Sequence, residues 1–395
     1  MQGRGRRVAI TGFGVVAPCG LGKEAFWAGL NGPGLSSGRS VEITDWDPSP
    51  YFENAKESRR ADRVEQFAVA AAAECFDHAG RPTADADRFG TIFGTGVGGL
   101  RSIQEQIEVL IEKGERRVSP FLVPMMMPNA SGAAISMRYG LKGPNETITT
   151  ACAASTHAIG YAARLIAWDM IDACVTGGSE SAGCSIGTSS FGNMTALSTS
   201  GHSRPFSPER DGFVLGEGAA AFMLEEWSAA VARGATIYGE VVGAASNADA
   251  HHITAPAPGG TGAILCMQLA LRDAALSAGD IRQINAHGTS TPLNDAAEAA
   301  AIAKVFGAGA VPVTSTKGVT GHALGAAGAL EAAALLLSMQ HKLIPPTAGT
   351  QQLDEGFEID LVMGKARAWE PGPSMSNSLG FGGHNGSLII SPPID

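Results

Sequence analysis

The sequence predicts an α/β fold, on the basis of its length, its composition and the alternation of its segments. The chain has 395 residues, of which 44% are hydrophobic and 17% charged, so it can bury a large core. At about 100–200 residues per domain, this length corresponds to two domains or one large one. Short β-branched runs alternate with Ala-rich helical segments, and this alternation favours helices packed on largely parallel sheets.

The predicted elements follow one another along the whole chain. Apolar and β-branched runs bounded by Gly, Pro or polar residues indicate strands, and longer Ala- and Leu-rich segments indicate helices. The predicted strands are 7–12, 88–94, 146–150, 173–177, 219–224, 281–286, 311–315 and 387–391. The predicted helices are 64–79, 100–113, 153–168, 262–275, 296–306 and 323–340, and linkers are predicted at 198–210 and 255–261.

Charge and cysteine content exclude several classes of function. The formal net charge is −10, without basic blocks, so nucleic-acid binding is not expected. Six scattered cysteines without a Cys-x-x-Cys pair argue against a disulfide scaffold and fit a reducing cytoplasm. The apolar run 8–19 contains glycines and a proline, which fit a strand and turn better than a signal peptide. No apolar stretch reaches the roughly 18 residues that span a bilayer, so we expect a cytoplasmic enzyme without membrane contact.

One cysteine lies where a nucleophile is commonly found. Cys152 follows a predicted strand and begins a helix of small residues, in the run Thr-Thr-Ala-Cys-Ala-Ala-Ser. The backbone dipole at a helix N-terminus favours an anion, so the thiolate is expected to form more readily near neutral pH. A free cysteine is also commonly an inert buried residue, and the spacing alone does not decide between the two.

Two histidines lie in loops rich in Gly and Thr. His287 follows a predicted strand, and His322 precedes a second helix of small residues. Strand ends are where α/β enzymes place functional groups, so this pair together with Cys152 indicates catalysis. Cys152 and His322 each lie at a helix start after a strand, which hints at two related halves. No carboxylate or cysteine lies at ligand spacing from the pair His251–His252, so no metal site is predicted.

Two glycine-rich segments allow other interpretations. Residues 94–99 match the dinucleotide-binding pattern, but no acidic residue ends a second strand at the expected spacing, so nicotinamide binding is not expected. Residues 377–386 contain glycines that suit an amide oxyanion donor on a mobile loop. They equally suit an ordinary tight turn, and both interpretations stay open.

Taken together, these motifs resemble those of the class II β-ketoacyl-acyl-carrier-protein synthases of the thiolase superfamily. The matching segments are 150–152, 210–216, 285–291, 317–331 and 380–383, and the likeness runs from residue 7 to about 390. The resemblance implies a thiolase-like five-layer αβαβα fold from two duplicated halves. Residues 1–240 would carry the nucleophile, and residues 241–395 the catalytic histidines.

The resemblance also implies a reaction. Cys152 takes an acyl group from a carrier-bound thioester, and the backbone amides of Cys152 and Phe381 form the oxyanion hole. His287 and His322 donate hydrogen bonds to a malonyl thioester and stabilise the enolate left by loss of carbon dioxide. This carbanion attacks the acyl-cysteine and extends the chain by two carbons. Neutral histidines suffice as donors, so the resemblance implies no metal or redox cofactor, and the phosphopantetheine arm belongs to the acyl carrier protein.

Further residues take supporting roles by the same resemblance. Lys317 and Glu331 order the His322 site, although the two could also be an ordinary ion pair. Asp295 fixes the loop of His287, and Phe381 acts as a gate. Two sets complete the predicted substrate site: Thr289 and Thr291 for the phosphopantetheine arm, and Val118, Met125 and Met126 for the acyl pocket near a dimer interface.

The expected partners are an acyl carrier protein and a second chain. Thr195 replaces a basic residue that docks the carrier in the family, so docking is expected at Arg59, Arg60 and Arg63, or at Lys142. Motifs of fatty-acid and polyketide enzymes are mixed here, and the pathway stays open. The chain is expected to form a homodimer, or a heterodimer with a chain-length factor as the ketosynthase of a type II polyketide synthase.

Two other functions are disfavoured. A non-catalytic chain-length partner lacks the nucleophile that Cys152 provides here. A thiolase acting on coenzyme A esters needs a second cysteine near the C-terminus, and residues 382–385 contain none.

Overall fold

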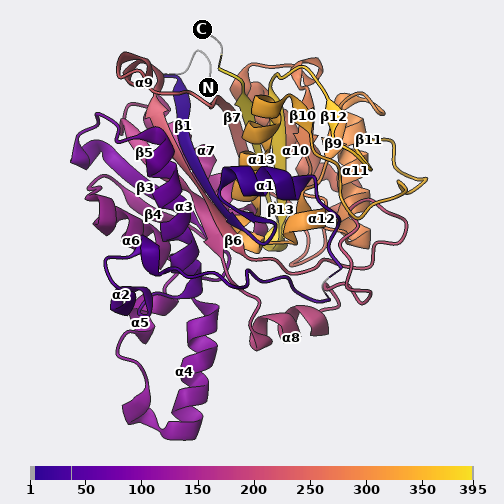
Figure 1. Ribbon diagram of the computed structural model, residues 1–395. Coiled ribbons are helices and arrows are strands. Elements are labelled where there is room, and N and C mark those ends of the chain that lie inside the picture. The colour runs from indigo at the N-terminus through magenta and orange to yellow at the C-terminus, as the bar shows by residue number, and fades with distance from the viewer. Residues whose placement is uncertain (1–4, 37, 394–395) are drawn as a thin grey trace.

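A computed structural model describes residues 5–36 and 38–393, and shows a mixed sheet system with helices on both sides and in the middle (Figure 1). The strands of the first half are β1 (Val8–Ala17), β3 (Phe89–Gly94), β4 (Asn145–Ile148), β5 (Ala173–Glu180) and β6 (Gly218–Glu226). Those of the second half are β7 (Gly239–Ala248), β8 (Gln283–Asn285), β9 (Pro312–Thr314), β13 (Ser374–Gly380) and β14 (His384–Ser391). The short strands are β2 (Gly20–Leu21), β10 (Leu343–Ile344), β11 (Asp360–Leu361) and β12 (Arg367–Ala368).

The two halves repeat one strand order. The first half runs β1-β6-β5-β3-β4 across the sheet, and the second runs β7-β14-β13-β8-β9. In both, the first two neighbouring pairs are antiparallel and the last two are parallel. The halves join where β1 pairs with β7 at Ala9 and Ile10. This repeat is what a duplicated fold produces, and the division at residue 240 stays a prediction.

The expectation of largely parallel sheets is wrong for the centre of the molecule. The neighbouring strands from β5 through β6, β1, β7 and β14 to β13 are all antiparallel. For β13 and β14 the reason is local, because only the three-residue turn Phe381–Gly383 joins them and so short a connection can return only an antiparallel strand.

The helices form three layers around the sheet halves. Helix α3 (Arg63–Ala79) covers the outer face of the first half, and α10 (Thr261–Ala274) with α11 (Pro292–Phe306) covers that of the second. Helices α7 (Ala154–Ala167) and α13 (Ala327–His341) lie between the halves. Their Ala-rich sequences, with few charged residues, suit a position in which both faces of the helix are covered. The result is the five-layer αβαβα arrangement.

Local signals set several helix ends. Asp62 caps α3 by accepting a hydrogen bond from the Val64 amide at 2.9 Å, and Gly80 with φ of 64° ends it. The predicted helix 100–113 is present as α4 (Leu100–Lys113), which projects from the body in Figure 1. The predicted helix 323–340 is interrupted, because a 3-10 turn at Leu324–Ala326 precedes α13. Helices not predicted are α1 (Lys23–Leu30), α2 (Ala55–Ser58), α5 (Leu122–Met126), α6 (Ala130–Tyr139), α8 (Ser185–Asn193), α9 (Trp227–Ala232) and α12 (Lys317–Thr320).

Strands β7 and β13 were also not predicted, although both lie inside the sheet. Their sequences are rich in Gly, Ala and Ser, so the β-branched signal that marks other strands is weak. Among the residues that the structure describes, no helix has the length and apolar character needed to cross a membrane.

Candidate active site

Cys152 sits in a tight turn between β4 and α7. The turn Ala151–Ala153 is a 3-10 helix, and Ala151 has φ of 49°, a left-handed conformation that is uncommon without glycine. Leu324 has φ of 42° at the equivalent place, three residues before α13. The two halves therefore carry the same unusual turn, at the two helix starts that the sequence singled out.

His322 is held through its backbone. Its amide donates to the Val214 carbonyl at 2.8 Å, and the Gly216 amide donates to the His322 carbonyl at 3.0 Å. The Phe213 ring packs edge-on against the imidazole, with ring centroids 5.1 Å apart. The segment 210–216, which carries part of the sequence resemblance, thus holds His322 in position.

His287 lies in the loop after β8, which two carboxylates of α11 hold. The Glu298 carboxylate accepts hydrogen bonds from the backbone amides of His287 and Gly288, each at 2.8 Å. The Asp295 carboxylate accepts one from the Thr289 amide at 2.9 Å. The predicted role of Asp295 fits these contacts. Glu298 was missed, although two acids three residues apart near the start of a helix after a catalytic loop are a usable signal.

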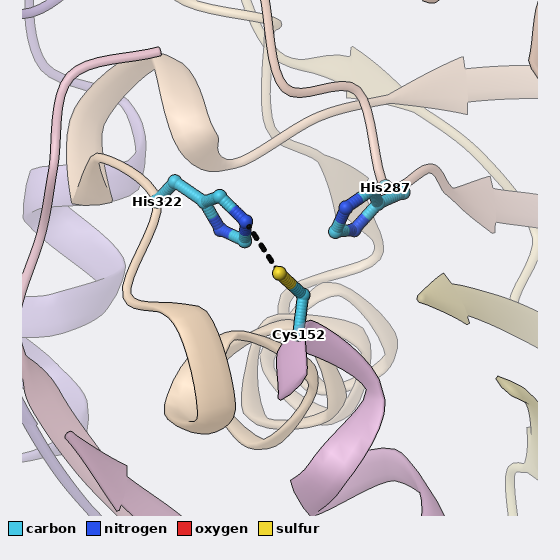
Figure 2. Close-up of side chains that lie close together, drawn as sticks. All are labelled: Cys152, His287 and His322. Carbon is cyan, nitrogen blue, oxygen red and sulfur yellow. Dashed lines mark hydrogen bonds between the residues drawn. The ribbon is translucent and has the colours of Figure 1, made fainter. Parts of the chain in front are cut away.

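The structure brings Cys152, His287 and His322 together (Figure 2). Sγ of Cys152 lies 3.1 Å from Nε2 of His322. The two imidazole rings stand nearly perpendicular, with centroids 5.2 Å apart. All three side chains are buried, and they come from both halves of the fold. Residues separated widely in the sequence therefore form one buried cluster.

Lys317 and Glu331 form a buried ion pair beside the histidines. The Lys317 ammonium contacts His287 directly, with Nζ 3.4 Å from Nδ1. Burial and the charge of Lys317 hold the pKa of both histidines well below the ordinary value, so both rings are neutral at pH 7. Because an ammonium can only donate, Nδ1 of His287 accepts and the ring proton stays on Nε2.

The expectation of a readily formed thiolate is wrong for the free enzyme. Burial raises the pKa of the Cys152 thiol to about 11, opposed by the Phe381 amide and by the charge of Lys317. The thiol is therefore protonated at neutral pH. Nε2 of His322, which contacts Sγ, is a potential acceptor for the thiol proton.

A metal ion fits this cluster poorly. Potential ligand atoms of the three residues lie within 4.8 Å of one another, so small side-chain movements would bring all three within bonding distance of one zinc ion. However, Lys317 keeps the His287 proton on Nε2 and adds a positive charge beside the ring. The arrangement suits hydrogen-bond donation better than metal ligation.

The three residues open into a cavity of about 340 Å³. Thr289, Thr291 and Phe381 also line it, and the hydroxyls of Thr289 and Thr291 lie 2.8 Å apart. Phe381 lies in the turn between β13 and β14, where Gly382 and Gly383 have φ of 82° and 75°. The Phe381 amide is directed at the Cys152 sulfur.

Other predicted residues lie elsewhere. Val118, Met125 and Met126 are not among the described residues that line the cavity; they lie half-buried at and just before α5, beside the projecting α4. Arg63 pairs with the buried carboxylate of Glu217, so it is not free to dock a carrier, and this part of the prediction is wrong. The side chains of Arg59, Arg60 and Lys142 are exposed.

The sequence of the chain matches two family models. Residues 34–230 match the Beta-ketoacyl synthase N-terminal domain, and residues 238–351 match the Beta-ketoacyl synthase C-terminal domain. The chain belongs to the beta-ketoacyl synthase family. It is accordingly an acyltransferase with the thiolase-like fold.

Individual relatives agree with this family. A protein of Coxiella burnetii named 3-oxoacyl-acyl-carrier-protein synthase 2 is 41% identical over 412 aligned residues, covering 99% of each chain. The solved ishigamide ketosynthase/chain length factor has a TM-score of 0.91 at 32% identity, covering 99% of this chain and 100% of that one. A type II ketosynthase solved in complex with its acyl-carrier protein has a TM-score of 0.90 at 30% identity, covering 99% and 100%.

Proposed function

We propose that this beta-ketoacyl synthase condenses a malonyl group on an acyl carrier protein with an acyl chain held on Cys152, and so extends the chain by two carbons. The observation that carries the proposal is the convergence of one thiol and two neutral histidines on one cavity. This set supplies a nucleophile and two uncharged hydrogen-bond donors, which are the groups that decarboxylative condensation needs.

The first half-reaction loads the enzyme. The Cys152 sulfur attacks the thioester carbonyl of an acyl carrier, and its proton passes to Nε2 of His322. The amides of Cys152 and Phe381 stabilise the oxyanion. The carbon–sulfur bond to the carrier then breaks, and the carrier thiolate takes the proton from His322. The acyl group is left on Cys152.

The second half-reaction uses both histidines as donors. His287 donates from Nε2 to the malonyl thioester oxygen, because Lys317 occupies its Nδ1. Nδ1 of His322 has no hydrogen-bond partner among the described residues, so that ring can carry its proton on either nitrogen, accepting at Nε2 first and donating from it later. The carbon–carbon bond to the carboxylate breaks, carbon dioxide leaves, and the enolate carbon attacks the acyl-cysteine carbonyl. The Cys152 thiolate departs and takes up one proton from water, so the condensation consumes one proton overall.

The carrier brings its own prosthetic arm. Thr289 and Thr291 bind the phosphopantetheine arm in this proposal, which their position in the cavity wall supports, and the enzyme uses no cofactor of its own. Because the chain is acidic overall, the acidic carrier docks on local basic side chains, for which exposed Arg59 and Arg60 are the candidates. Arg60 stacks over the Phe121 ring, 4.0 Å from its centroid, next to α5.

A second chain completes the acyl pocket in this proposal. Val118, Met125 and Met126 line the pocket at a dimer interface, and the working unit is a homodimer in the cytoplasm. The naming of the curated relatives as 3-oxoacyl-acyl-carrier-protein synthase 2 supports a fatty-acid role. The likeness to the ishigamide ketosynthase/chain length factor supports a second candidate, a type II polyketide ketosynthase paired with a chain-length factor.

The proposal is tested by separating the two half-reactions in one variant. Cys152→Gln removes the nucleophile and keeps both histidines, so it should lose condensation and still release carbon dioxide from malonyl-carrier. Absence of carbon dioxide release from this variant would contradict the role of His287 and His322.

A further inference from the structure

A histidine outside the reaction centre connects the turn of Cys152 to the turn of Phe381. His157 lies in the first turns of α7, five residues after the nucleophile. Its Nδ1 lies 2.8 Å from Oγ1 of Thr150, just before the nucleophile turn. Its Nε2 lies 3.0 Å from the carbonyl oxygen of Asn385 in β14, just after the Phe381 turn. One imidazole thus bridges the two segments that carry the oxyanion-hole amides.

The direction of both hydrogen bonds is fixed by chemistry. The Asn385 carbonyl can only accept, so Nε2 of His157 carries the proton and donates. Nδ1 therefore accepts from the Thr150 hydroxyl. The bridge in this form needs a neutral ring, and burial, the largest influence, holds the pKa of His157 below its ordinary value.

The bridged segments are in close contact. Thr156, next to His157, makes a second link through its hydroxyl, 2.7 Å from that of Ser378 in β13. A Cβ added at Gly380 would lie 3.0 Å from the Thr150 carbonyl oxygen and 3.2 Å from the Cys152 amide nitrogen. The register between α7 and the β13–β14 hairpin therefore sets how far the Cys152 amide lies from the Phe381 amide.

We propose that His157 is a positioning residue for acyl transfer, which holds the amides of Cys152 and Phe381 at the spacing that one oxyanion requires. The inference rests on the proposed function, because the oxyanion forms only if Cys152 accepts an acyl group. Decarboxylation uses the histidine side chains, which other contacts hold: Val214 and Gly216 for His322, and Glu298 for His287. His157 therefore acts on acyl transfer and not on decarboxylation.

Two substitutions test this role. His157→Phe keeps the ring volume and removes both hydrogen bonds, and His157→Gln keeps one acceptor and one donor. The rate of Cys152 acylation by an acyl carrier is measured in each, and carbon dioxide release from malonyl-carrier is measured with each change added to Cys152→Gln. His78→Phe is the matched control, since His78 is also half-buried and bonded to a backbone carbonyl, that of Phe13.

The expected result is a split between the two activities. His157→Phe should slow acylation about 10- to 100-fold, because the donors are displaced rather than lost, and loss of one oxyanion donor costs about 100- to 1,000-fold. His157→Gln should recover part of the rate. Carbon dioxide release should stay unchanged in both. Equal loss of the two activities, or unchanged acylation, would overturn the role. If His157→Phe fails to fold, Thr150→Val, which removes one bond of the bridge, must show the same split. Failure of the unmodified enzyme to acylate would instead refute the proposed function.

Discussion

Lys317 donates to Nδ1 of His287 across 3.4 Å, and this contact fixes Nε2 as the nitrogen of that ring that can act as a donor. The same ammonium pairs with Glu331, so both are buried without an unpaired charge. The pair was expected to act electrostatically on the His322 site, and the structure adds a direct contact between Lys317 and His287. Its charge reaches both rings and helps to keep both neutral.

Replacing Lys317 should separate its electrostatic role from its structural one. Lys317→Met leaves Glu331 buried without a partner, which typically costs about 3–5 kcal/mol of unfolding free energy. It also frees the ring proton of His287, so carbon dioxide release should fall about 100-fold. The double variant Lys317→Met/Glu331→Leu should regain stability in urea unfolding while release stays low. If stability and carbon dioxide release both recover in the double variant, the ion pair has only a structural role.

Glu298 should make the stability of the fold depend on pH. Burial raises the pKa of its carboxyl to about 7, from an ordinary value of 4.5. Between these values the folded state keeps a proton that the unfolded state has released, so the unfolding free energy falls as pH rises through this window, by up to about 3 kcal/mol. Glu298→Gln cannot titrate. Urea unfolding at about pH 5 and pH 8 should therefore show a smaller loss of unfolding free energy in the variant than in the wild type. Equal losses in the two proteins would contradict the raised pKa of Glu298.

The turn before α13 should be intolerant of side chains because it packs against the glycine-rich segment 94–99. A Cβ at Gly325, in the 3-10 turn Leu324–Ala326, would meet the Gly96 amide nitrogen at 2.2 Å, so the turn and the segment touch through backbone atoms. Gly325→Ala should cost about 3 kcal/mol or more of unfolding free energy. Gly309→Ala, where φ is 61° but nothing lies within 4 Å, should cost about 1 kcal/mol from backbone strain alone. Equal costs in thermal or urea unfolding would refute the close-packing explanation.

Carrier docking should depend on exposed arginines near α2. Arg59→Glu and Arg60→Glu should each raise the KM for acyl carrier about tenfold with kcat unchanged, and the effect should shrink in high salt. Arg282→Glu is the control, because Arg282 is exposed just before β8, at the end of that strand away from His287. The docking assignment fails if the control raises KM as much, or if kcat falls instead.

The sequence predicted which side chains converge on the cavity better than it predicted the elements around them. Cys152 and His322 were recognisable because each follows a strand and opens a small-residue helix, and the backbone repeats the same left-handed turn at Ala151 and Leu324. Strands β7 and β13 were missed, because their Gly-, Ala- and Ser-rich sequences become strands through sheet context rather than local propensity. Glu298 and His157 were missed because each acts through hydrogen bonds to other segments of the chain, which the local sequence does not show. The high pKa of Cys152 follows from burial, which local sequence does not reveal.

In the proposed reaction, Cys152 carries the growing chain. This role is tested by intact-protein mass spectrometry after the enzyme is offered acyl carriers of several lengths. The wild-type chain should gain an acyl adduct that is absent from Cys152→Ala and that leaves as a product two carbons longer when malonyl-carrier is added. An adduct that persists in Cys152→Ala, or elongation by that variant, would show that Cys152 is not the nucleophile.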